Sequence, residues 1–408
     1  MKKEFYKAKI RLERGGIINL INKTQLKLRR ICRRHLIVSR LAMSGLLSNY
    51  DLDSISSKKY IYTRDEQVRV PKNSSVDLPH VMQNMGAHDI AGLKVFEIED
   101  FILTGRGLLI SNDGEFVVES TRSSEEKLAD YFVSNTNILN EYSGLYRFMK
   151  SPHDILLKNL IKRETDEYIF PMIQYNSWNN YYHWILETLP TVRAYERYKS
   201  ETGNSPTILL KKNPPEYMIE SLSLLGIEPD QWKSLQSTNI YMAPKNIIFP
   251  ERRYWTGDFN DQFQPSGVDL KWLSRSIKES VNTSQSPTGS KLYISRNDAS
   301  VRRVINESEV MDRISQYGFE KILLSEYSVR DQVKIFSNAE SVIAPHGAGL
   351  ANTIFSDDIN ILEFIGERYR PPWFYYTSLL TGHNHQFLYC EETDGDYYVN
   401  IDKMIELI

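Results

Sequence analysis

The chain has 408 residues, of which 41% are hydrophobic and 25% are charged, and its formal net charge at pH 7 is -2. These values are typical of a globular protein with a sizeable core, and a chain of this length normally divides into two or more domains. The small net charge argues against a protein that binds nucleic acid over its whole surface. Cys32 and Cys390 are too few for a disulfide framework or a zinc ribbon, so we interpret both as free thiols in a reducing compartment.

The first 40 residues are the basic part of the chain. They include the run KLRRICRRH, and only Glu4 and Glu13 oppose the lysines and arginines. Apolar residues between the charges favour amphipathic helices, so we predict a basic helical extension over 1–50. Residues 1–45 are a candidate for peripheral contact with an anionic membrane. A helical extension packed on the body, or a weaker role in nucleic-acid binding, are the alternatives.

Targeting signals are not evident in the sequence. No apolar run is long enough to span a bilayer, and the start lacks the apolar region of a secretory signal. We therefore expect a cytoplasmic protein, at most peripheral to the inner face of the cell membrane.

Short β-rich segments separated by turns fill about residues 51–122. The Asp113-Gly114 pair between two apolar runs is a strong β-hairpin signal. This region is predicted to be a small β-rich module or a β extension of the first lobe.

From about residue 167 strands alternate with helices, which predicts parallel sheets covered by helices. The predicted strands are 167–175, 206–212, 246–250, 291–296, 319–325 and 359–366, and the predicted helices are 179–199, 214–226, 307–318 and 328–339. We predict an α/β protein with two Rossmann-like lobes, 51–265 and 266–408, and a ligand crevice at the carboxyl ends of the strands.

The stretch AESVIAPHGAGLANTIF reads as a strand, a tight turn and a helix. Gly347, Ala348 and Gly349 would let backbone N–H groups approach an anion at the helix start, beside His346. A plain strand-to-helix turn with no ligand is the alternative.

Arginines follow the predicted strand 291–296. Arg296 ends this strand, Arg302 and Arg303 stand in the next loop, and Ser295 offers a hydroxyl. Guanidinium groups bind phosphate oxygens in a fork, so these residues are candidates for an anion site, although surface ion pairs are a common alternative. Glu363 near the end of a buried strand is a candidate acceptor for ribose hydroxyls.

His183 and Glu187 are spaced i, i+4 on the predicted helix 179–199, so their side chains can touch. A carboxylate beside an imidazole is an arrangement suited to a general base. A buried structural histidine is the alternative interpretation.

The motifs YYHWILETLP, LYISR followed by RRVINESEV, SVIAPHGAGLANTIF and ILEFIG resemble glycosyltransferase family 61 in their order and spacing, over roughly residues 95–390. The resemblance implies a GT-B fold and an inverting, metal-independent transferase, with members in capsular polysaccharide biosynthesis, plant xylan synthesis and protein glycosylation. The donor is then a nucleotide-diphosphate sugar, expected to be UDP-linked, and the acceptor is a glycan or a lipid-linked glycan, with no cofactor and no nucleic-acid partner.

Carried over to this chain, the resemblance implies that Arg296 and Arg302 hold the diphosphate. Arg302 fits better than Arg303 because it stands four residues before Asn306. The turn amides would bind the same diphosphate, and His183, backed by Glu187, would face the donor from the N-terminal acceptor lobe. The gap between the two arginines is longer than in the family.

Two other functions stay open at this point. One is a non-catalytic protein of the same fold that binds a nucleotide sugar or a glycan. The other is a metal hydrolase that uses some of His183, His346, His383 and His385, although the acidic ligands expected beside them are not evident. We predict no metal site, because arginines and helix amides can neutralise a diphosphate and no Asp-x-Asp motif is obvious near the predicted crevice.

Overall fold

The computed structural model describes most of the chain, and every structural statement below refers to this part. The described residues are 52–69, 87–104, 107, 109–111, 117, 161–173, 179–235, 240–251, 265–283, 290–367 and 371–408. The predicted basic extension and the Asp113-Gly114 hairpin lie outside the described residues, so both stay predictions.

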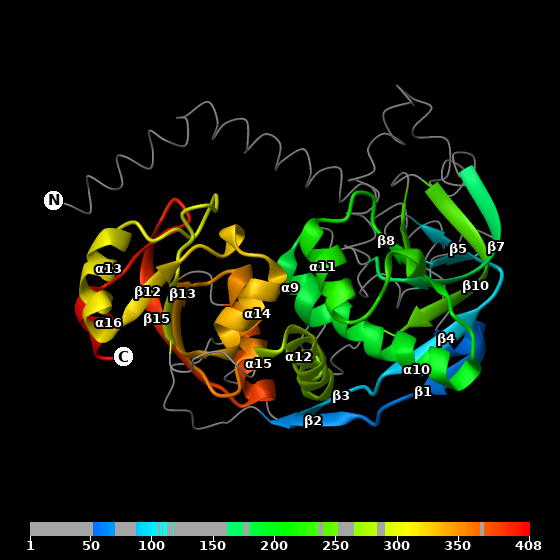
Figure 1. The fold of residues 1–408 in the computed structure, drawn as a ribbon, viewed down its shortest axis with the longest axis horizontal. Coiled ribbons are helices and arrows are strands. Elements are labelled where there is room, and N and C mark those ends of the chain that lie inside the picture. The colour runs from blue at the N-terminus through cyan, green and yellow to red at the C-terminus, as the bar shows by residue number, and fades with distance from the viewer. Residues whose placement is uncertain are drawn as a thin grey trace, which may run out of the picture.

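A mixed sheet forms the first half of the molecule, on the right in Figure 1. Its parallel part runs β9-β8-β7-β10, and β4, β5, β1 and β6 extend it with antiparallel pairs beyond β10. The strands are β1 (Ser56–Ile61), β4 (Lys94–Ile98), β5 (Phe101–Thr104), β6 (Leu109–Ser111), β7 (Ile161–Pro171), β8 (Thr207–Leu210), β9 (Trp232–Ser234) and β10 (Ile240–Pro250). The β-rich region therefore extends the first sheet, which was one of the two predicted possibilities.

The helices of the first half connect its parallel strands. They are α3 (Leu52–Ile55), α9 (Tyr181–His183), the π-helical η2 (Trp184–Thr188), the 3₁₀ helix η3 (Leu189–Thr191), α10 (Val192–Thr202), α11 (Glu216–Leu224) and the 3₁₀ helix η4 (Pro229–Gln231). The predicted helix 179–199 is helical throughout but passes through π and 3₁₀ turns around Pro190. Gly203 ends it with a left-handed φ of 75°, a conformation that favours glycine.

A second sheet forms the other half, on the left in Figure 1. Its order is β12-β11-β13-β14-β15-β16, and all neighbours are parallel except the last pair. The strands are β11 (Ser290–Ile294), β12 (Phe319–Ile322), β13 (Ala339–Pro345), β14 (Asn360–Gly366), β15 (Asn384–Thr393) and β16 (Asp396–Tyr398). The parallel strands thus follow the doubly wound order 2-1-3-4-5.

Helices cover both faces of this second sheet. They are α12 (Gly267–Val281), α13 (Glu307–Ile314), η6 (Ser315–Tyr317), η7 (Leu324–Glu326), α14 (Val329–Ser337), η8 (Ala348–Phe355), α15 (Trp373–Thr381) and α16 (Ile401–Ile405). Side chains of Ser266, Ser328 and Asn400 accept amide hydrogen bonds at helix starts. In Figure 1, α14 and α15 lie on the side toward the first half, and α13 and α16 lie on the outer side.

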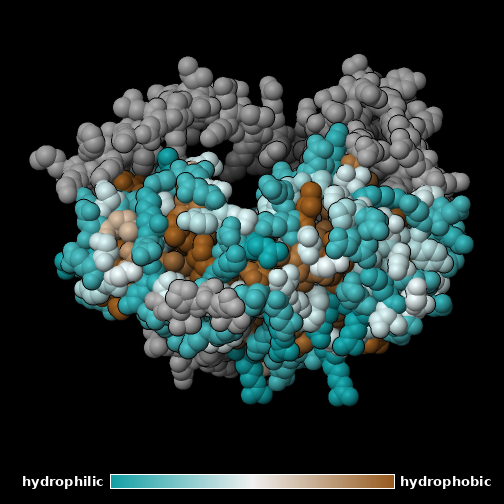
Figure 2. All heavy atoms as spheres, in the orientation of Figure 1, coloured by the Kyte–Doolittle hydropathy of each residue, from teal (hydrophilic) through white to brown (hydrophobic). Residues whose placement is uncertain are grey.

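One hydrophobic cluster runs through both halves of the molecule. It includes Trp184 and Tyr195 from the first half together with Phe336 and Phe374 from the second. Smaller clusters fill the outer face of each sheet. Figure 2 shows hydrophobic residues mainly in recesses between hydrophilic ones, and a notch in the described surface between the two halves. The shared core holds the two sheets against each other.

A two-stranded arm of β2 (Glu66–Arg69) and β3 (Ala87–Ile90) lies beneath α12 in Figure 1. Glu66 accepts a hydrogen bond from the Ser266 hydroxyl at 2.7 Å, at the start of α12. The predicted lobe boundary at 265/266 falls at this contact and stays a prediction. In the described part of the chain, no helix has the length and apolar character needed to cross a membrane.

Candidate functional site

The order of the second sheet reverses between β11 and β13. In doubly wound sheets the ligand crevice opens at the carboxyl ends of the strands at such a reversal. Ser295 and Arg296 directly follow β11, and the turn from His346 to Gly349 directly follows β13. The sequence-predicted residues of the second lobe therefore meet at the position that the topology favours for a ligand.

Arg296 packs directly on Gly347. A Cβ atom added to Gly347 would lie 2.0 Å from Nη1 of Arg296, so only glycine leaves room for this guanidinium. Gly347 has an extended φ of -175°, which any residue adopts, so space rather than backbone conformation requires glycine here. The arginine and the turn belong to one site, as the sequence predicted.

Arg296 and Arg302 form a positive cluster, and neither makes an ion pair with a described carboxylate. Burial lowers the pKa of Arg296, the charge of Arg302 lowers this pKa further, and the weaker effects of Asp298 and Asp396 oppose the shift. Nη2 of Arg296 donates to the Val301 carbonyl at 3.3 Å, while its buried Nε has no hydrogen-bond partner among the described residues. An anion bound here would relieve both the repulsion and the unsatisfied donor.

Arg302 and Arg303 have different roles in the structure. Arg303 makes two hydrogen bonds of 3.0 and 3.1 Å to one carboxylate oxygen of the buried Asp396, so it anchors β16. Arg302 adopts a left-handed φ of 61° and influences the pKa values of Arg296, His346 and Glu363. The preference for Arg302 over Arg303 in the anion site agrees with this geometry.

The 3₁₀ helix η8 starts at the anion site, and the first N–H groups of a helix have no intrahelical acceptor. These are the amides of Gly347, Ala348 and Gly349. The amide of His346 is different, because it donates to the Phe364 carbonyl at 2.9 Å. The backbone part of the candidate site therefore runs from Gly347 to Gly349.

His346 and Glu363 belong to a buried chain of hydrogen bonds. Nδ1 of His346 is bonded to Oε1 of Glu363, and Oε2 of Glu363 lies 2.9 Å from Nε2 of His385. Nδ1 of His385 lies 2.9 Å from the Ser378 hydroxyl on α15. Burial lowers the pKa of His346 well below its ordinary value, and burial raises the pKa of Glu363 against the opposing effect of His385.

Two predicted donor contacts do not fit this geometry. Glu363 is 0% exposed, and both its carboxylate oxygens contact histidines. The predicted hydrogen bond between Glu363 and a ribose hydroxyl is therefore wrong, and the carboxylate instead positions His346. Ser295 is also buried, and its hydroxyl donates to Glu307 at 2.7 Å rather than toward the crevice.

His183 stands on α9, which follows the carboxyl end of β7 in the first sheet. Its Nδ1 lies 2.8 Å from Oε1 of Glu187, as the i, i+4 spacing predicted, although the angle is outside hydrogen-bond range. The His183 side chain is 23% exposed and the Glu187 side chain 3%. The histidine is thus the accessible member of the pair. The intervening π turn is a feature that often occurs at functional sites.

Aromatic contacts join His183 to the anion site across the two halves. The Tyr182 ring packs edge-on against the His183 ring, with centroids 5.0 Å apart, and against the Phe374 ring at 5.3 Å. The Phe374 ring in turn lies 5.1 Å from the His346 ring. The Tyr181 hydroxyl donates to Asn352 of η8 at 2.7 Å. α9 therefore lies beside the turn that follows β13.

A cavity of about 550 Å³ opens beside this junction. Tyr181 and Tyr217 line it from the first half, and Leu324, Glu326 and Gly349 line it from the second. Burial raises the pKa of Tyr217 to about 12, so this phenol stays a hydrogen-bond donor at neutral pH. The cavity borders the anion site through Gly349 and lies within the size range of small-molecule sites.

Lys211 and Asn352 are site residues that the sequence analysis missed. Lys211 follows β8 and is 7% exposed, and its ammonium group donates to Asn179, next to the Asn180 cap of α9. Asn352 is fully buried between Tyr181 and Gln332. The only sequence signal for Lys211 was a lysine near the end of the predicted strand 206–212. No pattern in the sequence pointed to Asn352.

His383 and His385 are separated by one residue but have different environments. His385 contacts Glu363, whereas neither ring nitrogen of His383 meets hydrogen-bond geometry with a described residue. No group of three or more potential metal ligands occurs among the described histidines, cysteines and carboxylates. The described residues therefore offer no support for a metal hydrolase.

His383 should make the stability of the protein depend on pH. Burial lowers the pKa of His383, against the weaker effects of the Thr353 backbone and of Asp358 and Asp357, and Lys271 lowers it further. Below about pH 6.5 the unfolded chain then binds more protons than the folded one, so wild-type stability falls as pH falls, by up to about 1.4 kcal/mol per pH unit for this group. His383→Asn removes this contribution to the pH dependence of the unfolding free energy. The buried His346 is present in both proteins, so its contribution cancels in the difference between them.

Urea unfolding of wild type and His383→Asn at pH 7.5, 6.5 and 5.5 measures this effect. We expect the difference in unfolding free energy to shift in favour of the variant as pH decreases. A difference that stays constant over this range would contradict the assignment of a lowered pKa.

Comparison with known proteins agrees with the site. Residues 181–359 match the family model described as Glycosyltransferase 61, and no curated protein matches the sequence. The matched segment contains His183, Arg296, Arg302 and the turn from His346 to Gly349. These are the residues that the fold brings to one junction. The segment 181–359 is therefore similar to glycosyltransferase family 61, a family of glycosyltransferases.

Proposed function

We propose that this protein transfers a sugar, with inversion, from a nucleotide-diphosphate donor to a hydroxyl group of a glycan acceptor. The two halves would work as GT-B lobes, with the acceptor on lobe 51–265 and the donor on lobe 266–408. The observation that carries the proposal is the junction of α9 with η8. There the partly exposed His183 is linked through the rings of Tyr182 and Phe374 to the turn on which Arg296 packs.

The diphosphate binds first in this proposal. Arg296 and Arg302 supply positive charge, and the amides of Gly347, Ala348 and Gly349 supply donors from the start of η8. Such groups can neutralise the leaving diphosphate without a divalent cation. Transfer is therefore expected to continue in the presence of EDTA.

The nucleoside then occupies the cavity beside Gly349. In Rossmann-like folds an acidic residue after the second strand binds the ribose hydroxyls. The second strand of this lobe is β12, and Glu326 of η7 follows it and lines the cavity. Glu220 is less suited, because it already accepts hydrogen bonds from the amides of Val329 and Arg330 at 2.8 and 2.9 Å. We propose Glu326 in the role that Glu363 cannot take.

His183 acts as the general base. Its Nε2 takes the proton of the acceptor hydroxyl, the hydroxyl oxygen forms the new bond to the anomeric carbon, and the bond to the diphosphate breaks on the opposite face. Inversion follows from this single displacement. Glu187 is the weaker candidate for the base, because its side chain is only 3% exposed, and it instead holds His183 by contact with Nδ1.

The wider setting is also a proposal. A UDP-linked donor and a surface polysaccharide or other cell-envelope glycan as acceptor are what the family resemblance favours. A cytoplasmic enzyme with peripheral membrane contact through residues 1–45 would reach a lipid-linked acceptor.

Thermal unfolding with a panel of nucleotide sugars tests the function. A ligand at about 100 times its Kd stabilises the folded state by about 2.7 kcal/mol, so one nucleotide-diphosphate sugar should raise the Tm clearly above the others. Transfer from that donor to a panel of glycans, with and without EDTA, is the second measurement. If a donor binds and neither transfer nor hydrolysis follows, the non-catalytic binding protein is favoured. If EDTA abolishes transfer, the metal-independent mechanism is wrong.

A further inference from the structure

A second cavity lies on the opposite edge of the second sheet from the donor site. It has a volume of about 630 Å³ and lies between α12, the end of η8 and the end of α15. Its residues Ser356 and Asp357 precede β14, whereas the donor site follows the carboxyl end of β13. Seven-residue strands separate the two edges by on the order of 20 Å. This cavity therefore cannot be part of the donor site.

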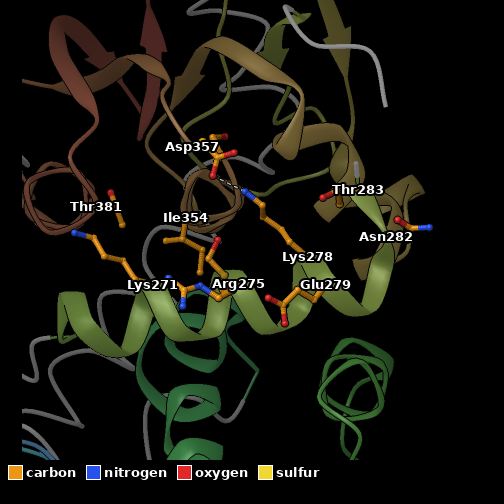
Figure 3. Close-up of a pocket in the computed structure, with 11 residues that line it drawn as sticks. Lys271, Arg275, Lys278, Glu279, Asn282, Thr283, Ile354, Asp357 and Thr381 are labelled. Atoms are coloured by element: carbon orange, nitrogen blue, oxygen red, sulfur yellow. Dashed lines mark hydrogen bonds and ion pairs between the residues drawn. The ribbon is translucent and has the colours of Figure 1, made fainter. Parts of the chain in front are cut away.

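Three basic side chains from one face of α12 line this cavity. They are Lys271, Arg275 and Lys278, spaced by about one helical turn, and Figure 3 shows them on the side of α12 that faces Ile354 and Thr381. Hydroxyl groups of Ser274, Thr283 and Thr381 are also part of the lining. The cavity thus combines positive charge with neutral hydrogen-bond donors.

Only one of these cations has a described counterion. Lys278 forms an ion pair with Asp357, drawn as a dashed line in Figure 3. Lys271 and Arg275 make no ion pair or hydrogen bond with another described residue. The remaining carboxylate, Glu279, lies eight residues after Lys271 but only four after Arg275, or about 6 Å along the helix axis, and it forms no ion pair with either among the described residues. Both side chains are exposed, so solvent and salt screen part of their repulsion, and an anion between them would remove the rest.

Helix stabilisation explains Lys278 but not the other two. Basic residues in the last turn of a helix interact favourably with the helix dipole, and Lys278 is in the last turn of α12. Lys271 and Arg275 lie in the middle of this helix, where the dipole effect is small. Their position in a recess is therefore better explained by a ligand.

We propose that this cavity binds a phosphate group, held by Lys271 and Arg275 with hydroxyl groups of the lining. A guanidinium fork and an ammonium group together match the oxygens of a phosphate monoester or diester. The phosphate is that of a soluble phosphorylated ligand or of a lipid headgroup. The site is independent of the donor site and of the transferase activity proposed above.

Chemical footprinting of the wild-type protein gives a readout specific to this cavity. The rate of Lys271 acetylation by an amine-reactive acetyl ester is followed by peptide mass spectrometry, with exposed Lys334 and Lys403 as internal references. The probes are inorganic phosphate, vesicles of phosphatidylcholine alone, and vesicles that also contain phosphatidylglycerol. A probe at about ten times its Kd should slow the acetylation of Lys271 by about tenfold relative to the references.

The variants identify the residues that bind the probe. Arg275→Ala keeps Lys271 as the reporter. It should raise the probe concentration needed for half-maximal protection by about tenfold or more, because a charged hydrogen bond is lost. Arg313→Ala, an exposed arginine on α13, is the charge-matched control and should leave protection unchanged. Arg296→Ala should also leave it unchanged, which separates this site from the donor site.

The outcomes distinguish the two sources of the phosphate group, and some of them would contradict the proposed site. Protection by inorganic phosphate identifies a soluble ligand, and protection only by vesicles with phosphatidylglycerol identifies a lipid headgroup. Unchanged acetylation of Lys271 with every probe overturns the proposal. So does protection that survives Arg275→Ala, or equal slowing of the reference residues Lys334 and Lys403, which would show that the probe masks lysines in general.

Discussion

Arg296→Ala is expected to lower kcat/KM for sugar transfer by at least about 10²-fold, because it removes a pre-positioned donor from the leaving diphosphate. The side chain is partly buried, close to Arg302, and its Nε has no described partner, so an anion gains more from it than from an exposed arginine. Donor affinity should fall as well, since the same group binds the diphosphate before transfer. Steady-state kinetics and calorimetry with the nucleotide diphosphate measure the two effects.

Three further variants separate charge, geometry and position. Arg296→Lys keeps the charge but loses the fork and should recover only part of the activity. Gly347→Ala keeps the arginine in the sequence but forces its guanidinium to move, because the added Cβ would lie 2.0 Å from Nη1, so it should weaken donor binding too. Arg313→Ala is the control for loss of an arginine elsewhere. If Arg296→Ala bound the nucleotide diphosphate within about twofold of wild type, the diphosphate would not lie at this arginine.

His183→Ala should reduce kcat by about 10²–10⁴-fold, the usual contribution of a general base, and should leave donor affinity unchanged. This separation of effects distinguishes it from Arg296→Ala, which should alter both. Glu187→Gln is expected to be less damaging, because an amide oxygen can still contact Nδ1 although the negative charge is lost. Rapid-quench kinetics at saturating donor measure the chemical step directly.

Chemical rescue tests whether His183 acts as a base or only supports the fold. Its side chain is 23% exposed, so imidazole in solution can enter the space left by His183→Ala and should restore part of the rate. His383→Asn serves as the control, because this histidine precedes β15 at the opposite edge of the sheet. Transfer at near wild-type rates by His183→Ala, without imidazole, would assign the proton transfer to another group.

Local sequence patterns were sufficient to predict the elements around the site. Apolar runs followed by glycine or polar turns located β11, β13 and β14, and their order along the chain predicted a parallel sheet. The same patterns placed Arg296 and the turn after β13 at strand ends. Residues at the carboxyl ends of adjacent parallel strands lie close together. β11 and β13 are not consecutive in the chain, so their adjacency was expected only from the Rossmann-like fold and was established by the sheet order.

Burial and partners decided what the sequence could not. Glu363 reads as a strand-end carboxylate, yet pairing with β15 and packing of α15 surround it with His346 and His385. The sequence analysis did not predict α12 and α15, because it did not recognise the helical spacing of the apolar residues in these two segments. The cavity that they form with η8 was therefore invisible from the sequence.

What the sequence by itself determined is most of the strands and helices from β7 to β14, without β9 and α12, and the residue types at their ends. The tertiary structure alone decided that α9, which carries His183, lies beside the turn after β13. The contact between Tyr181 and Asn352 that sets this position joins residues 171 apart in the chain. Such a contact arises only when two sheets share one core, and no local pattern of apolar and polar residues encodes the relative position of separate sheets.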